Sequence, residues 1–378
     1  MKTSLSHHAP SLEHAFLTRR QMLNRVGMGF GGLALGSLFS DNASAASTLN
    51  PLAVKKPHFE PKAKRMVHFF MNGGPSQVDT FDPKPMLDKY DGKPLPNVLK
   101  TERPTGAGFK SPFQFKKHGQ CGTEISDLFP KLSEFADDLC VIRSMHADVP
   151  NHEPSLGLMN SGEGRLNRPT MGSWVTYGLG SENSDLPAFV VLTSGGSDPD
   201  AGKSVWGSGF LPSVYQGVQC RSTGDPVLFI KDPEGMTRDM RKASIDAINQ
   251  VNQQEYEEYK DPEILSRISQ YEMAYKMQIT APEVMNINNE PEYIREMYGI
   301  RDGKNSFANN VLLARKLVEK GVRFVQLFDW GWDSHGAGES EALSHGFKDK
   351  CQSIDRALMA LITDLKQRGL FEETLIVW

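Results

Sequence analysis

The sequence predicts an α/β fold in which a mostly parallel sheet is flanked by helices. Short apolar runs recur along the chain without a clean alternation of apolar and polar residues, which is typical of strands buried on both faces. Amphipathic helical patterns separate these runs, and strands that alternate with helices favour a parallel sheet. The two observations together indicate one large α/β domain.

The first part of the chain has the features of a twin-arginine export signal. Arg19 and Arg20 stand before an uncharged apolar run at residues 26–39, and a small-residue cleavage pattern follows at residues 43–45. The run is shorter than the about 20 residues that a membrane-spanning helix needs. We therefore assign residues 1–45 to a cleaved signal, with the twin-arginine translocase as partner during export. The mature protein is expected to be periplasmic or secreted, with no stable membrane span.

The first half of the mature chain is predicted to begin with a linker rich in Pro and Lys. The elements expected after it are a strand that runs into a glycine turn, a helix, a second strand, a helix that starts after Pro154, a third strand, and a helical insertion or cap. The linker spans residues 46–64. The first strand is predicted at residues 65–71, the helix after it at 126–135 and the second strand at 138–142. The third strand is predicted at residues 189–192 and the insertion at about 231–291.

The second half shows the clearest periodicity. Residues 305–320 form an amphipathic pattern that Gly321 ends, residues 322–328 form an apolar strand, and residues 347–365 carry a stripe of period 3.6. A last strand is predicted at residues 374–378. Because this strand is the end of the sequence, we expect the domain at 65–378 to be truncated, with a further strand–loop unit missing.

Charge and cysteine content exclude some classes of protein. The formal net charge of −4 gives no reason to expect a nucleic acid partner. The four cysteines are scattered, with no Cys-x-x-Cys pair, which argues against a thiol–zinc site. Cys140 and Cys351 lie in apolar patterns and are expected in the core.

Three polar clusters follow predicted strands, and ligands of parallel α/β folds bind beyond the carboxyl ends of the strands. The first cluster, at residues 72–85, begins with Asn72 and two glycines that would let the backbone approach a ligand. Asp79 and Asp82 offer carboxylates for a metal ion. A polar loop in which Asp79 only caps a turn is the alternative.

The second cluster, at residues 146–155, contains His146 and His152 ahead of a predicted helix. The N-terminus of a helix presents free N–H groups and a partial positive charge, which suit an anionic group. Two histidines with Asp148 and Glu153 in one short loop favour ligand or acid–base roles over a structural role.

The third cluster, at residues 329–336, contains Asp333 and His335 in a loop flanked by glycines. A carboxylate and an imidazole at this spacing can converge on one cation, and these donors suit Zn²⁺, Mn²⁺ or Fe. The alternative is that Asp333 only orients a surface histidine.

These motifs together resemble one family. Asn-Gly-Gly-Pro-Ser at residues 72–76, Asn-His-Glu-Pro-Ser at residues 151–155 and Trp-Asp-Ser-His at residues 332–335 occur in the same order in a large, functionally uncharacterised family of secreted bacterial proteins. That family is related to the alkaline phosphatase and sulfatase superfamily. The resemblance covers residues 65–378 and implies an alkaline phosphatase-like three-layer sandwich. In the family the last strand leads into Gly-Glu-Phe-Gly-Arg and a loop that bears a histidine, both absent here.

The resemblance also implies roles for individual residues. Asn72 stands where the superfamily has a metal-binding Asp, so Asp79 is expected to assist it. His152 falls at about the position of the nucleophile, and Asp333 with His335 matches the metal-binding loop. The chain has no Cys in a Cys-x-Pro-x-Arg context, so formylglycine chemistry is not supported.

The leading hypothesis is thus an exported metal-dependent hydrolase of phosphate or sulfate esters, acting on small molecules or polysaccharides. Asp333, His335, Asp79 and Asn72 would bind a divalent metal (Zn, Mn, Ca or Mg), and His152 and His146 would be catalytic. One alternative is a non-catalytic descendant of the fold that binds a glycan or a protein. A weaker one is an oxidoreductase partner, because twin-arginine cargo often carries cofactors, although no haem, flavin or dinucleotide motif is present.

Overall fold

The computed structural model describes residues 50–96, 106–149, 151–165, 167–222, 224–228, 230–300 and 306–378. The predicted export signal at residues 1–45 lies outside this part of the chain. Residues 50–55, from the predicted linker, lie against the rest of the protein: Leu52 is buried, and the Lys55 N–H donates to the Leu179 carbonyl. Within the described ranges, no helix is both long enough and apolar enough to cross a membrane.

The centre of the protein is a parallel sheet with the strand order β5–β4–β6–β1–β7, which confirms the predicted sheet. In β6 (Phe324–Asp329) all six residues are buried, as expected for a central strand covered on both faces. The other strands are β1 (Arg65–Met71), β4 (Phe189–Ser194), β5 (Val218–Cys220) and β7 (Thr374–Val377).

The register brings the ends of three strands together. Met71 of β1 pairs with Asp329 of β6, and Asp329 pairs with Ser194 of β4. The loops that follow these three strands therefore leave the sheet side by side at its carboxyl edge.

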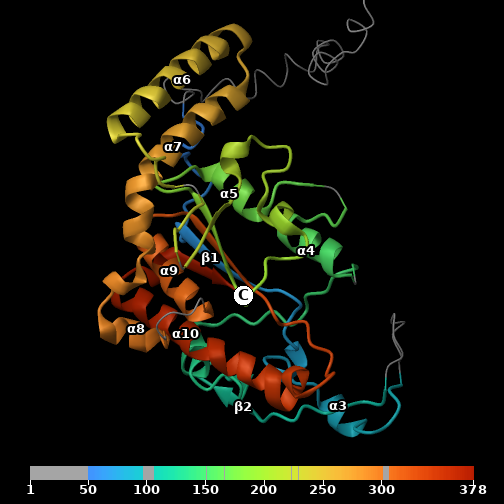
Figure 1. The fold of residues 1–378 in the computed structure, drawn as a ribbon. Helices are drawn as coiled ribbons and strands as arrows, with labels where there is room; N and C mark the ends of the chain where they lie inside the picture. The colour runs from blue at the N-terminus through green and yellow to red at the C-terminus, as the bar shows by residue number, and fades with distance from the viewer. Residues whose placement is uncertain are drawn as a thin grey trace, which may run out of the picture. The chain divides into compact units, whose positions relative to one another are not determined.

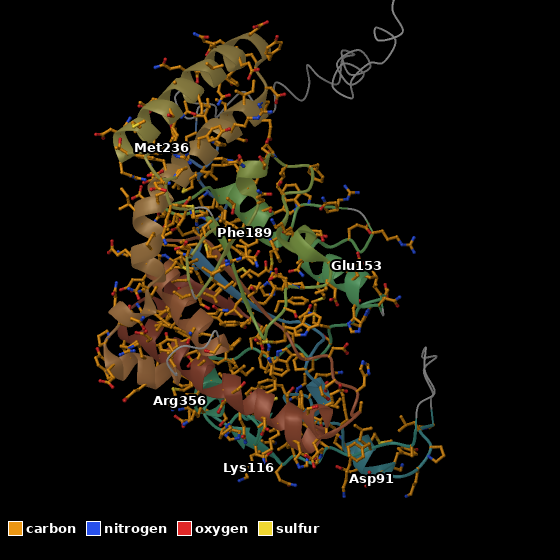
Figure 2. The ribbon with its side chains drawn as sticks, viewed as in Figure 1. Asp91, Lys116, Glu153, Phe189, Met236 and Arg356 are labelled. Atoms are coloured by element: carbon orange, nitrogen blue, oxygen red, sulfur yellow. The ribbon has the colours of Figure 1, made fainter. Side chains whose placement is uncertain are left out.

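Helices cover both faces of the sheet (Figure 1). On one face, α9 (Phe307–Glu319) packs against the strands, and α8 (Glu292–Tyr298) and α10 (Lys348–Gln367) pack against α9. On the other face lie α4 (His152–Ser161) and α5 (Met171–Leu179). Phe189 of β4 lies beneath α5, where its ring meets the backbone of Gly172 (Figure 2). The two covered faces make a helix–sheet–helix arrangement.

The segment predicted as a helical insertion contains two long helices, α6 (Arg238–Tyr259) and α7 (Pro262–Met285), which pack side by side (Figure 1). Each has a capped start: the Thr237 side chain accepts from the Met240 N–H, and the Asp261 side chain accepts from the Glu263 N–H.

The segment before α4 differs from the prediction. The predicted strand at 138–142 is wrong: a 3-10 helix (Leu132–Asp138) is followed by irregular backbone in which Ile142 is 63% exposed. The helix predicted at 126–135 is also wrong over its first residues, because β3 (Thr123–Ser126) ends there, paired antiparallel with β2 (Phe115–His118). Short apolar runs do not by themselves distinguish a strand from a loop.

Of the two cysteines predicted to lie in the core, one is buried and one is exposed. Cys351 is buried in α10, as predicted, whereas Cys140 is exposed, so its expected place in the core is wrong. A further short helix is α3 (Pro85–Lys89).

Candidate functional site

Two glycine turns hold the loop that follows β6. The Cβ of any other residue at position 73 would lie 2.2 Å from the Asp333 backbone nitrogen, and at position 195 it would lie 2.5 Å from the Trp330 carbonyl oxygen. Both glycines also have φ values, +104° and +85°, that L-residues rarely adopt. The glycine expected to approach a ligand after β1 therefore approaches the backbone of Asp333, and the loop at 330–333 is seated between the ends of β1 and β4.

Asp329, the last residue of β6, anchors the start of this loop. Its carboxylate is 1% exposed and accepts hydrogen bonds from Ser194 Oγ (2.6 Å) and from Trp332 Nε1 (2.8 Å). Lys350 of α10 places its Nζ 2.8 Å from Asp329 Oδ2 and donates to the Trp330 carbonyl at 2.6 Å. A buried carboxylate with this many partners fixes the course of the loop.

Asp333 stands between two histidines. Its Oδ1 lies 2.9 Å from His335 Nε2, and its Oδ2 lies 3.3 Å from His152 Nε2. The side chains of His152, Asp333 and His335 are 55%, 39% and 59% exposed, so solvent reaches all three. We refer to these three residues as the Asp–His cluster.

His152 is the first residue of α4, so it brings a helix N-terminus to the cluster. Asn151 precedes it with extended backbone, and the Asn151 side chain makes no capping hydrogen bond. The first N–H groups of a helix have no partner within the helix, so those of His152 and Glu153 are available to an anion. Figure 2 shows Glu153 on this part of α4, on the outside of the protein.

Buried hydrogen bonds tie α4 to the sheet. Gln326 of β6 donates from Nε2 to Asn160 Oδ1 at 2.6 Å, and Asn160 Nδ2 donates to the Leu156 carbonyl at 2.8 Å. Both amide side chains are almost fully buried. Because β6 also leads into the loop of Asp333, one strand positions both halves of the cluster.

On the other side of the cluster, Glu341 holds the segment around His335. Glu341 Oε2 accepts from the backbone N–H groups of His335 (3.1 Å) and Ala337 (3.3 Å). These two hydrogen bonds, that of His335 first, lower the pKa of Glu341. The Glu341 carboxylate thus stays charged and holds the loop that contains His335 and Ala337.

The other predicted site residues lie in different settings. Asn72 is buried beside the loop, with its N–H donating to the Asp329 carbonyl (2.8 Å) and its carbonyl accepting from the Trp332 N–H (3.2 Å). Its side-chain Oδ1 is buried with no hydrogen-bond partner among the described residues. His146 is 83% exposed, and its only ion-pair partner in the described chain is Asp148, at 4.0 Å.

Asp79 is held by two serines, one three residues before it and one 32 residues after it. Ser76 Oγ and Ser111 Oγ each donate to one of its carboxylate oxygens at 2.6 Å, and the side chain is buried. Asp82 pairs with Lys84 at 2.6 Å. The bond from Ser76 is local to the turn, whereas the bond from Ser111 joins Asp79 to a distant segment.

Comparison with protein families identifies the chain. The family described as "Protein of unknown function (DUF1501)" matches residues 63–378. The chain belongs to this family. Comparisons with curated proteins and with solved structures find no match. What the site of this DUF1501 member can do is therefore argued from its own residues.

The donors of the Asp–His cluster are of the type that binds a divalent metal. Two ligands of one ion, at about 2.0–2.2 Å from it, lie around 3 Å apart, close to the 2.9 Å between Asp333 and His335. In the described ranges, no group of three or more His, Cys, Asp or Glu side chains is placed to hold a metal ion. The 3.3 Å between Asp333 and His152 fits this spacing as well, so Asp333 could share one ion with either histidine, through a different oxygen in each case.

Residues that the sequence analysis did not select support this site. Ser194 and Lys350 hold Asp329, which itself lies in the third polar cluster but was not chosen as a site residue. A charged residue directly after an apolar strand was a usable signal for Asp329. The sequence contained no such signal for Lys350, because it is one of two lysines at the polar start of its helix.

A cavity of about 860 Å³ lies elsewhere, between the segment after β5 and α7, and is lined by residues such as Arg221, Gln278 and Met285. Members of the Asp–His cluster do not line it. We base the candidate site on the cluster, because the cluster is where titratable side chains converge at the carboxyl edge of the sheet.

Proposed function

We propose that this DUF1501 protein is an exported hydrolase that cleaves phosphate or sulfate esters on an alkaline phosphatase-like scaffold. The observation that supports this most is the placement of Asp333 between His152 and His335, at the carboxyl edge of a parallel sheet and at the N-terminus of α4. A carboxylate, two imidazoles and free helix N–H groups supply ionic, acid–base and anion-binding functions in one place.

In the proposed reaction the N-terminus of α4 binds an oxygen of the phosphate or sulfate group, since its N–H groups point out of the helix. Because His152 Nε2 faces Asp333, the other ring nitrogen, Nδ1, accepts the proton of the attacking water. The water oxygen forms the bond to phosphorus or sulfur while the bond to the alcohol oxygen breaks. The leaving alkoxide takes a proton from solvent, and His152 later returns its proton to solvent. Asp333, in contact with His152, stabilises the protonated imidazole. Direct attack by His152 is the alternative, and it would leave a covalent phosphohistidine.

A divalent metal (Zn, Mn, Ca or Mg) fits the donors of Asp333 and His335. The buried Asn72 Oδ1, which has no hydrogen-bond partner in the described chain, is a further oxygen donor beside this loop. When bound, such a metal would lower the pKa of a water molecule to about 7 or polarise the ester oxygen.

The test uses full-length protein purified after export. Metal content is measured by mass spectrometry, and hydrolysis of p-nitrophenyl phosphate and p-nitrophenyl sulfate is followed with and without added Zn²⁺ or Mn²⁺. We expect Asp333→Asn and His335→Gln to lower both metal content and rate by about 100-fold or more. The matched control is His118→Gln, on the β2–β3 hairpin, which should behave as wild type. A protein without metal and without hydrolysis, unchanged by Asp333→Asn, would exclude the enzyme.

The second candidate is a non-catalytic protein of the same fold that binds a glycan or another protein. The exposure of all three side chains of the Asp–His cluster favours it, because catalytic groups usually lie where water is excluded. The two candidates separate in the same experiment: a binding protein shows no turnover of either ester.

The proposed export depends on residues 1–45. Replacing Arg19 and Arg20 by Lys together should keep the precursor in the cytoplasm, which cell fractionation detects. Unchanged export of this variant would exclude the twin-arginine route.

A further inference from the structure

A second surface with an unusual composition lies on the outer side of α5. Trp174 and Tyr177 of α5 and Phe210 of the adjacent loop are 45%, 41% and 61% exposed. We call these three residues the aromatic patch. Among the described residues of α5 and of the loop at 207–212, all the large apolar side chains that are exposed are aromatic.

The rings of the patch are held in place by one another. Trp174 meets Phe210 edge to face, with centroids 5.8 Å apart, and meets Tyr177 in the same way at 5.9 Å. Tyr177 in turn meets the buried Tyr215 at 5.2 Å, whose hydroxyl donates to the Pro51 carbonyl. Each edge-to-face contact covers one face of one ring, and the exposure of all three side chains leaves part of their apolar surface open to a ligand. The spacing is comparable to the length of one sugar residue in an extended glycan.

Two cations flank the patch. Lys55 Nζ lies 4.8 Å from the centre of the Tyr177 ring, and the Arg168 guanidinium lies 6.0 Å from the centre of the Phe210 ring. Within the described ranges, neither makes an ion pair with a carboxylate; Lys55 Nζ donates to the Tyr177 carbonyl. Burial without a nearby carboxylate lowers the pKa of Lys55. The patch therefore combines exposed aromatic side chains with two cations that pair with no carboxylate in the described part of the chain.

We propose that the aromatic patch binds an anionic polysaccharide, whose sugar rings stack on Trp174 and Phe210 and whose sulfate or carboxylate groups meet Arg168 and Lys55. Sugar rings present apolar C–H faces to aromatic rings, and cations supply the charge complementarity. A protein is the competing occupant, because Trp, Tyr and Arg are also enriched at protein interfaces. The two cations without a carboxylate partner in the described ranges favour the anionic polymer.

The patch is distinct from the Asp–His cluster. The Gly180 carbonyl, directly after α5, accepts from Arg323 Nε, and Arg323 precedes β6. α5 thus ends at the amino edge of the sheet, whereas the cluster lies at the carboxyl edge. Binding at the patch does not depend on the proposed hydrolysis.

The experiment is affinity electrophoresis of the full chain in gels that contain dextran sulfate, polygalacturonate or neutral dextran. We expect retardation by the anionic polymers and none by neutral dextran. Trp174→Ala with Phe210→Ala should weaken the apparent affinity about tenfold or more. The double change Lys55→Gln with Arg168→Gln should remove the preference for anionic polymers. The dextran sulfate and polygalacturonate arms show whether sulfate or carboxylate is the recognised group.

Three controls make the result decisive. Tyr293→Ala removes an aromatic side chain that is 69% exposed on α8, away from the patch, and should bind as wild type. Circular dichroism confirms that each variant is folded. Asp333→Asn should keep full binding, since loss of binding there would place the polymer at the Asp–His cluster and overturn the proposal. The proposal would also be overturned if the wild type were not retarded, or if the Trp174→Ala/Phe210→Ala variant were retarded as strongly as the wild type. It would be overturned as well if the wild type self-associated and this variant did not, because the patch would then bind a second copy of the protein.

Discussion

Lys350 Nζ lies 2.8 Å from Asp329 Oδ2 and so joins the start of α10 to the carboxyl end of β6. The same ammonium group donates to the Trp330 carbonyl at 2.6 Å and lies 5.5 Å from the centre of the Trp332 ring. One side chain thus neutralises the buried carboxylate below the candidate site and holds the backbone that leads to Asp333.

Replacing Lys350 by Met should therefore destabilise the protein. The variant leaves the Asp329 carboxylate, which is 1% exposed, without its counter-charge, and we expect a loss of about 2–4 kcal/mol in the free energy of unfolding. Urea denaturation followed by tryptophan fluorescence measures this loss. Lys242→Met is the control, because Lys242 pairs with Asp246 on an exposed helix surface and should change stability little. Equal effects of the two changes would contradict the proposed role of Lys350.

The two glycines after β1 allow a matched test of the seating of the loop. Gly73 and Gly74 both have positive φ, +104° and +87°, but only at Gly73 would a Cβ collide with the backbone of Asp333. Gly74→Ala should cost about 1–2 kcal/mol from backbone strain alone. Gly73→Ala should cost a further 1–3 kcal/mol, roughly, from overpacking. Thermal denaturation compares the two, and equal losses would show that the close approach has no energetic role.

His68 predicts a specific pH dependence of stability. It is buried in β1, and desolvation lowers its pKa from 6.5 to about 4. As the pH falls below about 6.5, the unfolded chain takes up a proton at His68 that the folded protein does not bind until about pH 4. Stability therefore falls over this window, by about 2–3 kcal/mol at pH 4.5 relative to pH 7.5. Above pH 7 this group makes no pH-dependent contribution.

His68→Leu should remove that share of the acid sensitivity. The measurement is the free energy of unfolding in urea at pH 7.5 and at pH 4.5 for wild type and variant. Carboxylates titrate equally in both proteins, so the difference between the two pH effects isolates His68. If both proteins lost the same stability, the histidine would not be held neutral by burial.

The hydrogen bond between Gln326 and Asn160 should couple α4 to the sheet. Gln326→Leu leaves Asn160 Oδ1 buried without this donor, and we expect a loss of about 1–3 kcal/mol. A double-mutant cycle with Asn160→Leu should give a coupling energy of about 1 kcal/mol or more. The control cycle uses Gln253 and Glu257 on α6, which are joined on the surface at 3.1 Å and should show weaker coupling. Independent effects of the two buried changes would mean that α4 is positioned by apolar packing alone.

Much of the fold could be predicted because local periodicity encodes it. The pattern at residues 305–320 became α9, the apolar run after it became β6, and the stripe that includes Cys351 and Leu365 became the buried side of α10. The false strand at 138–142 shows the limit. A run of about four apolar residues has too few positions to show a period, and in the folded chain Arg143 beside it donates to the Phe81 carbonyl in a surface loop.

The site could be predicted in part. The sequence placed three polar clusters at one edge of the sheet, and two of them supply the contacts among His152, Asp333 and His335. The second polar cluster, which contains His152, was expected at this edge because a strand was predicted at residues 138–142. The structure has no strand there. This second cluster reaches the site because α4 is tied to β6 through Asn160.

The sequence by itself determined the α/β class and which residues could carry charge near the strand ends, since both follow from side-chain chemistry and from spacing along the chain. Only the tertiary structure decided which of them meet. The order β5–β4–β6–β1–β7 brings β6 between β1 and β4, so the loop of Asp333 lies against Gly73 and Gly195. The same packing gives both oxygens of Asp79 to Ser76 and Ser111 and leaves His146 in solvent. Contacts of this kind depend on segments that are distant in sequence, so no local pattern contains them.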